Sequence, residues 1–258
     1  MSAAPVKDDR APAGRLRIAG WVAGSVAAAC AAAALLAGLG YRAGWLALGP
    51  ALQAIRVSTI LALVAFPAAL GVLLMALRAQ APYAAALAGC AALLALCVAG
   101  PPVYLWWQGQ VLPHLHDVST DTVNPPAFEA VLPLRRGARN PAHYDPRTAA
   151  AQHAGYPDIA PVALDLPPAR AMVLAGQAAR EMGWRIVADD PAALRIEATA
   201  TTPLFGFQDD VVIRITPSAG GSRVDIRSLS RVGGSDFGAN AKRIRAFAER
   251  LRALAVPS

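Results

Sequence analysis

The chain of 258 residues is 55% hydrophobic, has a mean hydropathy of +0.40 and carries a formal net charge of +7. Between Ile18 and Trp107 the only charged residues are three arginines, and no acidic residue lies between Asp9 and Asp117. A water-soluble domain of that length would need charged surface throughout, so this composition excludes a wholly soluble protein and indicates a membrane region.

The basic excess is concentrated in the hydrophobic half of the chain. Residues 1–109 carry seven Lys or Arg and two Asp, a net charge of +5, whereas residues 110–258 carry seventeen Lys or Arg and fifteen acidic residues, a net charge of +2. Positive charge beside hydrophobic segments is typical of membrane topology and not of a nucleic-acid-binding surface, so we expect no nucleic-acid partner.

Three hydrophobic segments, residues 18–40, 57–77 and 83–107, follow a short N-terminal tail of residues 1–17. Each reaches the roughly 20 residues that a helix needs to cross the hydrocarbon core. In lipid each must be helical, because only a helix satisfies its own backbone. The sequence therefore predicts a three-helix transmembrane anchor over residues 18–107, in which Pro101 and Pro102 kink or terminate the last turn.

The orientation of this anchor follows from its flanking charges. Five basic residues are expected on the side of the N-terminus and two on the opposite side: Lys7, Arg10, Arg15, Arg17 and Arg78 against Arg42 and Arg56. The positive-inside rule then favours a cytoplasmic N-terminus. We predict a multi-pass protein of the cell inner membrane, with everything after Trp107 in the periplasm.

Small residues recur on one face of the first hydrophobic segment. Gly20, Gly24 and Ala28 are spaced by four, which allows two helices to approach closely, either within the bundle or in a homo-oligomer formed through this helix. No acidic residue or histidine lies in a predicted span, so a proton relay has no carrier there. All three cysteines lie in hydrophobic segments, so the C-terminal region has no disulfide and no cysteine metal ligand.

Residues 108–168 contain ten prolines, a density that excludes long helices and central strands. We predict an extended arm that lies along the C-terminal domain. The apolar residues available to anchor it are Val118, Val123, Phe128, Val131, Leu132, Tyr156 and Ile159.

Residues 169–258 are expected to form a small α+β domain. Helical spacing over residues 169–182 is followed by alternating patterns at 185–188, 193–201, 211–216 and 223–232, and by a final helix to about Leu254. Ser235 or Asp236 is suited to cap that helix. The order predicts a four-stranded antiparallel meander with two helices on its apolar face. The expected core is Val211, Ile213, Ile215, Val224 and Ile226 from the strands, with Ile244, Phe247 and Leu251 from the final helix.

The opposite face of this predicted sheet is polar and carries both signs of charge. Its side chains are Arg195, Glu197, Arg214, Asp225 and Arg227. We interpret them as cross-strand ion pairs, each contributing less than about 1 kcal/mol.

Four residues at the start of the arm have side chains that can bind a metal. His114 and His116 are two apart, so both point to the same side of an extended segment, and Asp117 and Asp121 follow. Catalytic zinc would need a third ligand and a general base, for which His143 and His153 are the only other histidines. The alternative is a structural or solvent-exposed role. We expect no cofactor.

A second group of candidates surrounds the last two predicted strands. Asp209 and Asp210 suit acid–base chemistry, a cation or a salt bridge. Arg227, Arg231 and Ser235 with the amides after Asp236 could hold an anion, or the loop could serve only to cap the helix. Neither Rossmann glycine spacing nor a Walker lysine is present. We predict that these charges meet in one neighbourhood and that Arg231 pairs with Asp209, Asp210 or Asp236.

Several short motifs resemble a known family, domain-of-unknown-function family 1499 (DUF1499), in its bacterial, membrane-fused form. The matching residues are 204–207, 209–211, 227–233, 235–238, Asn240 and 243–244 in the domain, and 116–122, 124–128 and 156–159 in the arm. The resemblance covers roughly residues 114–254. It implies an α+β domain that is often exported or membrane-linked, but it implies no activity or ligand.

These observations favour a membrane-anchored protein with an extracytoplasmic binding or assembly module, whose partners are the lipid bilayer and a membrane or periplasmic protein. A membrane-tethered hydrolase or metal-dependent enzyme is the alternative, and an anion- or lipid-headgroup-binding domain is a further one. We assign no catalytic residue. The candidate binding residues are Asp209, Asp210, Arg227, Arg231, Ser235, Asp236 and Asn240.

Overall fold

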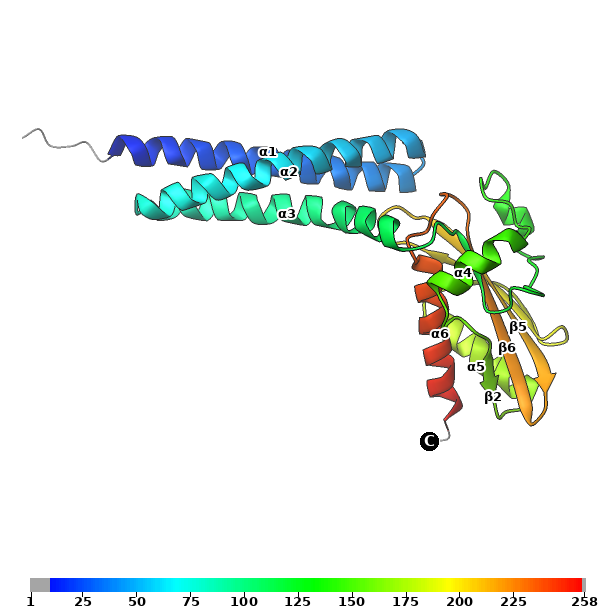
Figure 1. Cartoon of the computed structure of the whole chain (residues 1–258). Coiled ribbons are helices and arrows are strands. Elements are labelled where there is room, and N and C mark those ends of the chain that lie inside the picture. The colour runs from blue at the N-terminus through cyan, green and yellow to red at the C-terminus, as the bar shows by residue number, and fades with distance from the viewer. Residues whose placement is uncertain (1–9, 257–258) are drawn as a thin grey trace, which may run out of the picture. The chain divides into compact units, whose positions relative to one another are not determined.

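The computed structural model describes residues 10–256, so Lys7 of the predicted tail and Ser258 lie outside the described residues. The chain divides after Trp107 into two compact units, which are described separately. The first contains helices α1 (Arg10–Arg42) and α2 (Leu48–Arg78) and most of α3 (Pro82–Val111) (Figure 1). Each helix is long and apolar enough to cross a membrane.

The helices exceed the hydrophobic segments at their ends. α1 already begins at Arg10, within the predicted tail, and α2 begins at Leu48, so Arg56 lies inside α2 and not in the first loop as predicted. α3 continues through Pro101 and Pro102, which therefore do not terminate it. A helix of 31 residues is about 45 Å long, so its ends extend beyond a hydrocarbon core of about 30 Å.

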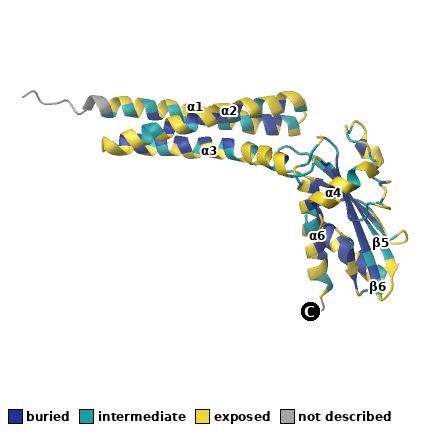
Figure 2. Ribbon diagram, viewed as in Figure 1, coloured by how far each residue is buried: buried dark blue, intermediate teal, exposed yellow. Residues whose placement is uncertain are grey.

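The anchor has small residues inside and large apolar residues outside. Its fully or nearly buried hydrophobic side chains are alanines and Cys30, while leucines, valines and Trp21 are exposed. A Cβ atom on Gly20 would lie 3.1 Å from the Cβ of Leu87 in α3, whereas Gly24 has no such neighbour and Ala28 is exposed. Figure 2 shows the exposed residues along these helices. This pattern suits lipid and not water, and with the three apolar helices it marks a membrane protein.

The second unit contains a six-stranded antiparallel sheet in the order β1-β6-β5-β4-β3, with β2 also paired to β6. Its long strands are β3 (Arg185–Asp190), β4 (Arg195–Thr201), β5 (Gln208–Ser218) and β6 (Gly221–Ser230). The predicted meander is therefore correct, but the strand number of four is wrong. The additional strands, β1 (Asp117–Ser119) and β2 (Val162–Leu164), come from the arm and pair with opposite halves of β6.

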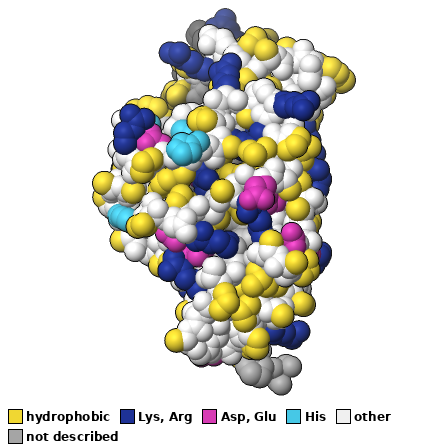
Figure 3. Space-filling view, turned by 90° about the vertical axis from the view of Figure 1, so that its right-hand side faces the viewer, with side chains coloured by type: hydrophobic (Ala, Val, Ile, Leu, Met, Phe, Trp, Pro, Cys, Tyr) yellow, Lys and Arg dark blue, Asp and Glu magenta, His cyan; other side chains and the backbone are white. Residues whose placement is uncertain are grey.

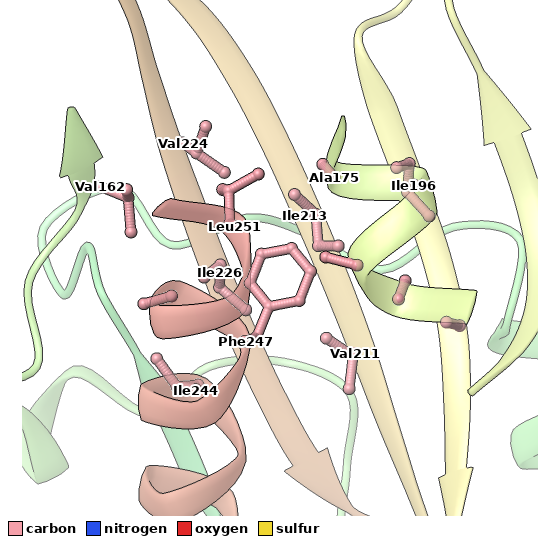
Figure 4. Close-up of a cluster of buried hydrophobic side chains, with 14 of the residues drawn as sticks. Val162, Ala175, Ile196, Val211, Ile213, Val224, Ile226, Ile244, Phe247 and Leu251 are labelled. Carbon is pink, nitrogen blue, oxygen red and sulfur yellow. The ribbon is translucent and has the colours of Figure 1, made fainter. Parts of the chain in front are cut away.

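One face of the sheet forms the hydrophobic core with α5 (Pro168–Glu181) and α6 (Ala239–Ala255). The predicted apolar residues of β5 and β6 are all buried there, as are the three predicted residues of α6. Figure 4 shows Phe247 and Leu251 of α6 packed over Ile213 and Ile226. Each fully buried side chain of this size contributes roughly 1.5–3 kcal/mol, so this layer is a large source of stability for the domain.

The arm covers the other face of the sheet. It contains the 3-10 turns η1 (Leu132–Arg135) and η2 (Pro146–Thr148) and the short helix α4 (Ala149–Gly155). Phe128 and Val131 of the arm form a second apolar cluster with Val212 and Leu229 of the sheet. Of the seven apolar residues predicted to attach the arm to the domain, five are buried, while Val123 and Leu132 are exposed. The polar face is thus an internal interface between the sheet and the arm, which lies along the domain as predicted.

Candidate functional site

The candidate residues of the last strands divide between the two faces of the sheet. Adjacent residues on a strand point to opposite faces, so Asp210 faces the arm while Asp209 faces helix α6. In the register of β5 and β6, Asp210 lies opposite Leu229, which packs against the arm, and Asp209 lies opposite Ser230. The prediction that both acids and both arginines share one neighbourhood is therefore wrong.

Asp210 is the centre of the first cluster on the arm face. Its buried carboxylate accepts hydrogen bonds from Arg231 Nε at 2.9 Å and Nη2 at 2.8 Å, from Arg135 Nη1 at 2.5 Å and from Thr199 Oγ1 at 2.8 Å. The predicted pairing of Arg231 is thus confirmed with Asp210 as its partner. Burial lowers the pKa of Arg135, and the hydrogen bond and charge of Asp210 oppose that shift. One carboxylate therefore joins β4, β5 and β6 to the arm.

Arg227 is the centre of the second cluster. Its Nε and Nη2 donate to the two carboxylate oxygens of Asp117 at 2.9 and 2.7 Å, and Nη2 also donates to the carbonyl of Ala142 at 2.8 Å. The guanidinium lies over the rings of Phe128 and Tyr144, with 4.9 and 5.4 Å to their centroids. Only 2% of Arg227 is exposed. This arginine is enclosed by the arm and has no room for a further ligand.

A third cluster holds the start of the arm to the far half of β6. Arg214 and Arg223 both donate to Asp121 at 3.1 Å, and both also contact Asp225. Arg214 and Asp225 lie opposite each other on β5 and β6, so the predicted cross-strand pairing is confirmed for these two residues, and Asp225 is only 1% exposed. Asp121 also accepts the backbone N–H of Asn124 at 2.8 Å, which closes the turn after β1.

Glu197 accepts hydrogen bonds from the backbone of the arm. It is 1% exposed, and its two carboxylate oxygens accept the backbone N–H groups of Glu129 at 2.9 Å and Val131 at 3.0 Å. Arg195 donates to the same carboxylate at 3.0 Å. A carboxylate that accepts backbone donors from a distant segment acts as a cap for that segment.

The helix-side candidates form a separate network at the start of α6. Asp209 accepts from Arg243 at 2.5 Å, and Asn240 accepts from Ser228 Oγ at 2.7 Å and donates to the carbonyl of His116 at 3.0 Å. Asp236 accepts the backbone N–H groups of Gly238 at 2.8 Å and Asn240 at 2.7 Å. α6 begins at Ala239, later than predicted, but Asp236 still accepts the backbone N–H of the second residue of the helix, Asn240.

The carboxylate of Asp236 also bears on whether the loop could bind an anion. Burial raises the pKa of Asp236, while its hydrogen bonds from the backbone of Asn240 and Gly238 oppose the shift. Ser235 Oγ accepts the backbone N–H of Phe237, at 3.3 Å. Because Asp236 occupies the donors that an anion would use, the loop is a structural cap in the described conformation.

The metal-capable residues of the arm do not converge. His114 is exposed, Asp117 faces Arg227 and Asp121 faces two arginines. His153 Nε2 lies at hydrogen-bond distance, 3.2 Å, from Thr122 Oγ1. Within residues 10–256 no group of three His, Cys, Asp or Glu could hold a metal ion. On the face shown in Figure 3, acidic side chains lie beside basic ones, in keeping with internal charge pairing.

Sequence reasoning missed three residues that complete these clusters. Arg135 comes from the arm and Arg243 from α6, and Gln152 of α4 exchanges hydrogen bonds with the backbone of Ser119 at 2.9 and 2.7 Å. The family resemblance included residue 243, but no spacing pattern connects residue 135 or 152 with a strand. A groove beside α5 is lined by Met172, Gly176, Leu194 and others, and it contains none of the candidates.

The comparisons with known proteins give one finding. A family model described as "Protein of unknown function (DUF1499)" matches residues 117–251, which is more than half of the chain. The match begins at β1 and ends within α6, so it includes the arm together with the sheet and both core helices. No curated protein and no solved structure gives a significant match.

Proposed function

The chain belongs to the DUF1499 family, and on that basis we propose that it is a membrane-anchored, non-catalytic module that binds or assembles with a partner outside the cytoplasm. Three membrane-spanning helices tether the family domain, so its partners must be reached at the membrane surface. The exposed loops of the domain, and not its charged motif residues, contact the partner.

The observation that carries this proposal is that the charged motif residues pair with other residues inside the domain. Asp210, Arg227, Asp225 and Glu197 are almost completely buried, and each is bound by another segment of the same domain. A general base or nucleophile must reach a substrate, whereas these groups hold the arm on the sheet. A rigid domain of this kind is suited to present a surface.

The proposed location is the inner membrane, with the N-terminus in the cytoplasm and the domain in the periplasm. The basic residues Arg15, Arg17 and Arg78 near one end of the bundle support this orientation, against Arg42 at the other end. The aromatic residues Trp45 and Trp106 are exposed near the end assigned to the periplasmic interface, where such rings are enriched.

A pair of fusions tests the orientation. Alkaline phosphatase joined after Ser258 should be active, and a fusion in the loop at Gln80, between α2 and α3, should be inactive although stably made. The reverse pattern would overturn the periplasmic assignment.

A native gel of the full chain extracted in mild detergent tests assembly. We expect a complex larger than the monomer, which reverts to the monomer in harsh detergent. Migration as a monomer under both conditions would contradict the assembly role.

A further inference from the structure

The chain joins the sheet at one particular end, which we call the tether end. β1 begins at Asp117, β5 begins at Gln208 and β6 ends at Ser230, and their pairing places all three at that end. Asp117 follows the last residue of α3, Val111, by six residues, so it lies within about 20 Å of the end of that helix even if the link is fully extended. The tether end is therefore the end of the domain at which the chain arrives from α3.

Two loops project at the tether end, the arm loop (residues 132–139) and the β4–β5 loop (residues 202–207). Arg231 joins them. Its Nη1 donates to the carbonyl of Leu134 at 2.8 Å and to the side chain of Gln208, which directly follows the β4–β5 loop. The carbonyl of Arg231 accepts the N–H of Arg139 at 2.9 Å. The two loops are thus fixed as one surface.

This surface combines apolar tips with cations. Leu132, Leu134 and Leu204 are 44%, 41% and 38% exposed. Arg136 and Arg139 are exposed and make no ion pair with any acid among the described residues, unlike the buried arginines of the arm face. Exposed leucines beside uncompensated arginines match an interface in which apolar tips enter the headgroup region while cations contact phosphates.

We propose that the two loops dock the domain on the anionic phospholipid headgroups of the membrane that the chain itself spans. This inference rests on the proposed function, because it names the bilayer surface as one binding partner of the module. It does not require the periplasmic assignment, because the link between α3 and the domain is equally short on whichever side of the membrane the domain lies. Two arginines near an anionic surface should strengthen binding to it, relative to a neutral surface, by a factor on the order of ten or more.

Hydrogen exchange of the full chain in lipid nanodiscs tests the docking. We expect amides of residues 132–139 to exchange about tenfold more slowly in discs containing phosphatidylglycerol than in pure phosphatidylcholine. The double variant Arg136→Gln and Arg139→Gln should lose this difference. A matched double variant, Arg170→Gln and Arg252→Gln, removes the same charge from exposed positions at the other end of the domain and should keep it.

A second variant tests the apolar part independently. Leu132→Ser with Leu134→Ser should also weaken protection while leaving the exchange of β5 and β6 unchanged, which verifies that the domain remains folded. Equal exchange of the arm loop in both kinds of disc would overturn the proposal even if the orientation and assembly experiments succeed. Protection that appears only when solubilised native membranes are added would show a protein partner for this surface and would overturn it as well.

Discussion

Replacing Asp210 by alanine is the most direct test of the structural role of the motif charges. The carboxylate is fully buried and accepts four hydrogen bonds, three of them from the guanidinium groups of Arg135 and Arg231. The side chains of these arginines are only 5% and 13% exposed. The substitution therefore leaves two poorly hydrated cations close together without their counter-charge.

The expected magnitude follows from that burial. Breaking a buried ion pair by removing one partner costs about 3–5 kcal/mol, which at an m-value of about 2 kcal/mol per molar lowers the urea midpoint by about 1.5–2.5 M. Pulse proteolysis of the full chain in detergent across a urea series measures this midpoint for the domain. Unfolding of β5 and the arm should coincide, because Asp210 holds both.

A matched control uses the exposed pair of Arg180 and Asp189, whose side chains are 57% and 34% exposed. Asp189→Ala should cost at most about 1 kcal/mol and shift the midpoint by less than about 0.5 M. If Asp210→Ala shifts the midpoint no more than this control does, the interpretation that Asp210 holds the arm on the sheet is refuted. A ligand-binding role would then be the better explanation of Asp210.

Three further substitutions test other parts of the structure. Ile226→Asp places a carboxylate in the core at a cost of several kcal/mol and should abolish the protease-resistant domain, whereas Val123→Asp at a 95% exposed position should not. Glu197→Ala frees two backbone donors of the arm, at about 1–3 kcal/mol, and should speed cleavage within the arm; unchanged cleavage kinetics would argue against the cap. Burial raises the pKa of Tyr156 to about 12, so its hydroxyl ionises more readily in the unfolded chain than in the folded domain, and the free energy of unfolding falls as the pH rises from about 10 to about 12. Tyr156→Phe should remove that alkaline loss and, because the buried hydroxyl has no partner among the described residues, should not lower the urea midpoint at pH 7.

Local periodicity explains why much of the fold could be predicted. Hydrophobic length indicated three membrane helices, and alternation placed Ile213 and Ile226 in the core, where both are fully buried. The same alternation rule separates Asp209 from Asp210, so the prediction of a single charge cluster was avoidable from the sequence. The strands β1 and β2 were not predictable in this way, because three residues are too few to show a period.

The partners of the charged residues depend on contacts that are distant in sequence. Arg227 is separated from Asp117 by 110 residues and Arg135 from Asp210 by 75. No spacing rule relates such positions. Residues 110–258 contain seventeen basic and fifteen acidic residues, and many ways of pairing them are compatible with the same composition. Only the path of the arm across the sheet selects one set.

By itself the sequence determined the membrane anchor, the two-faced sheet and its apolar core, because each depends on the hydrophobicity and period of a continuous segment. The tertiary structure alone decided that the polar face is covered, and with it the meaning of the motif residues. An arginine or aspartate has the same local pattern whether water or a distant segment lies against it. Its burial, and therefore its energetic role, is set by what folds over it.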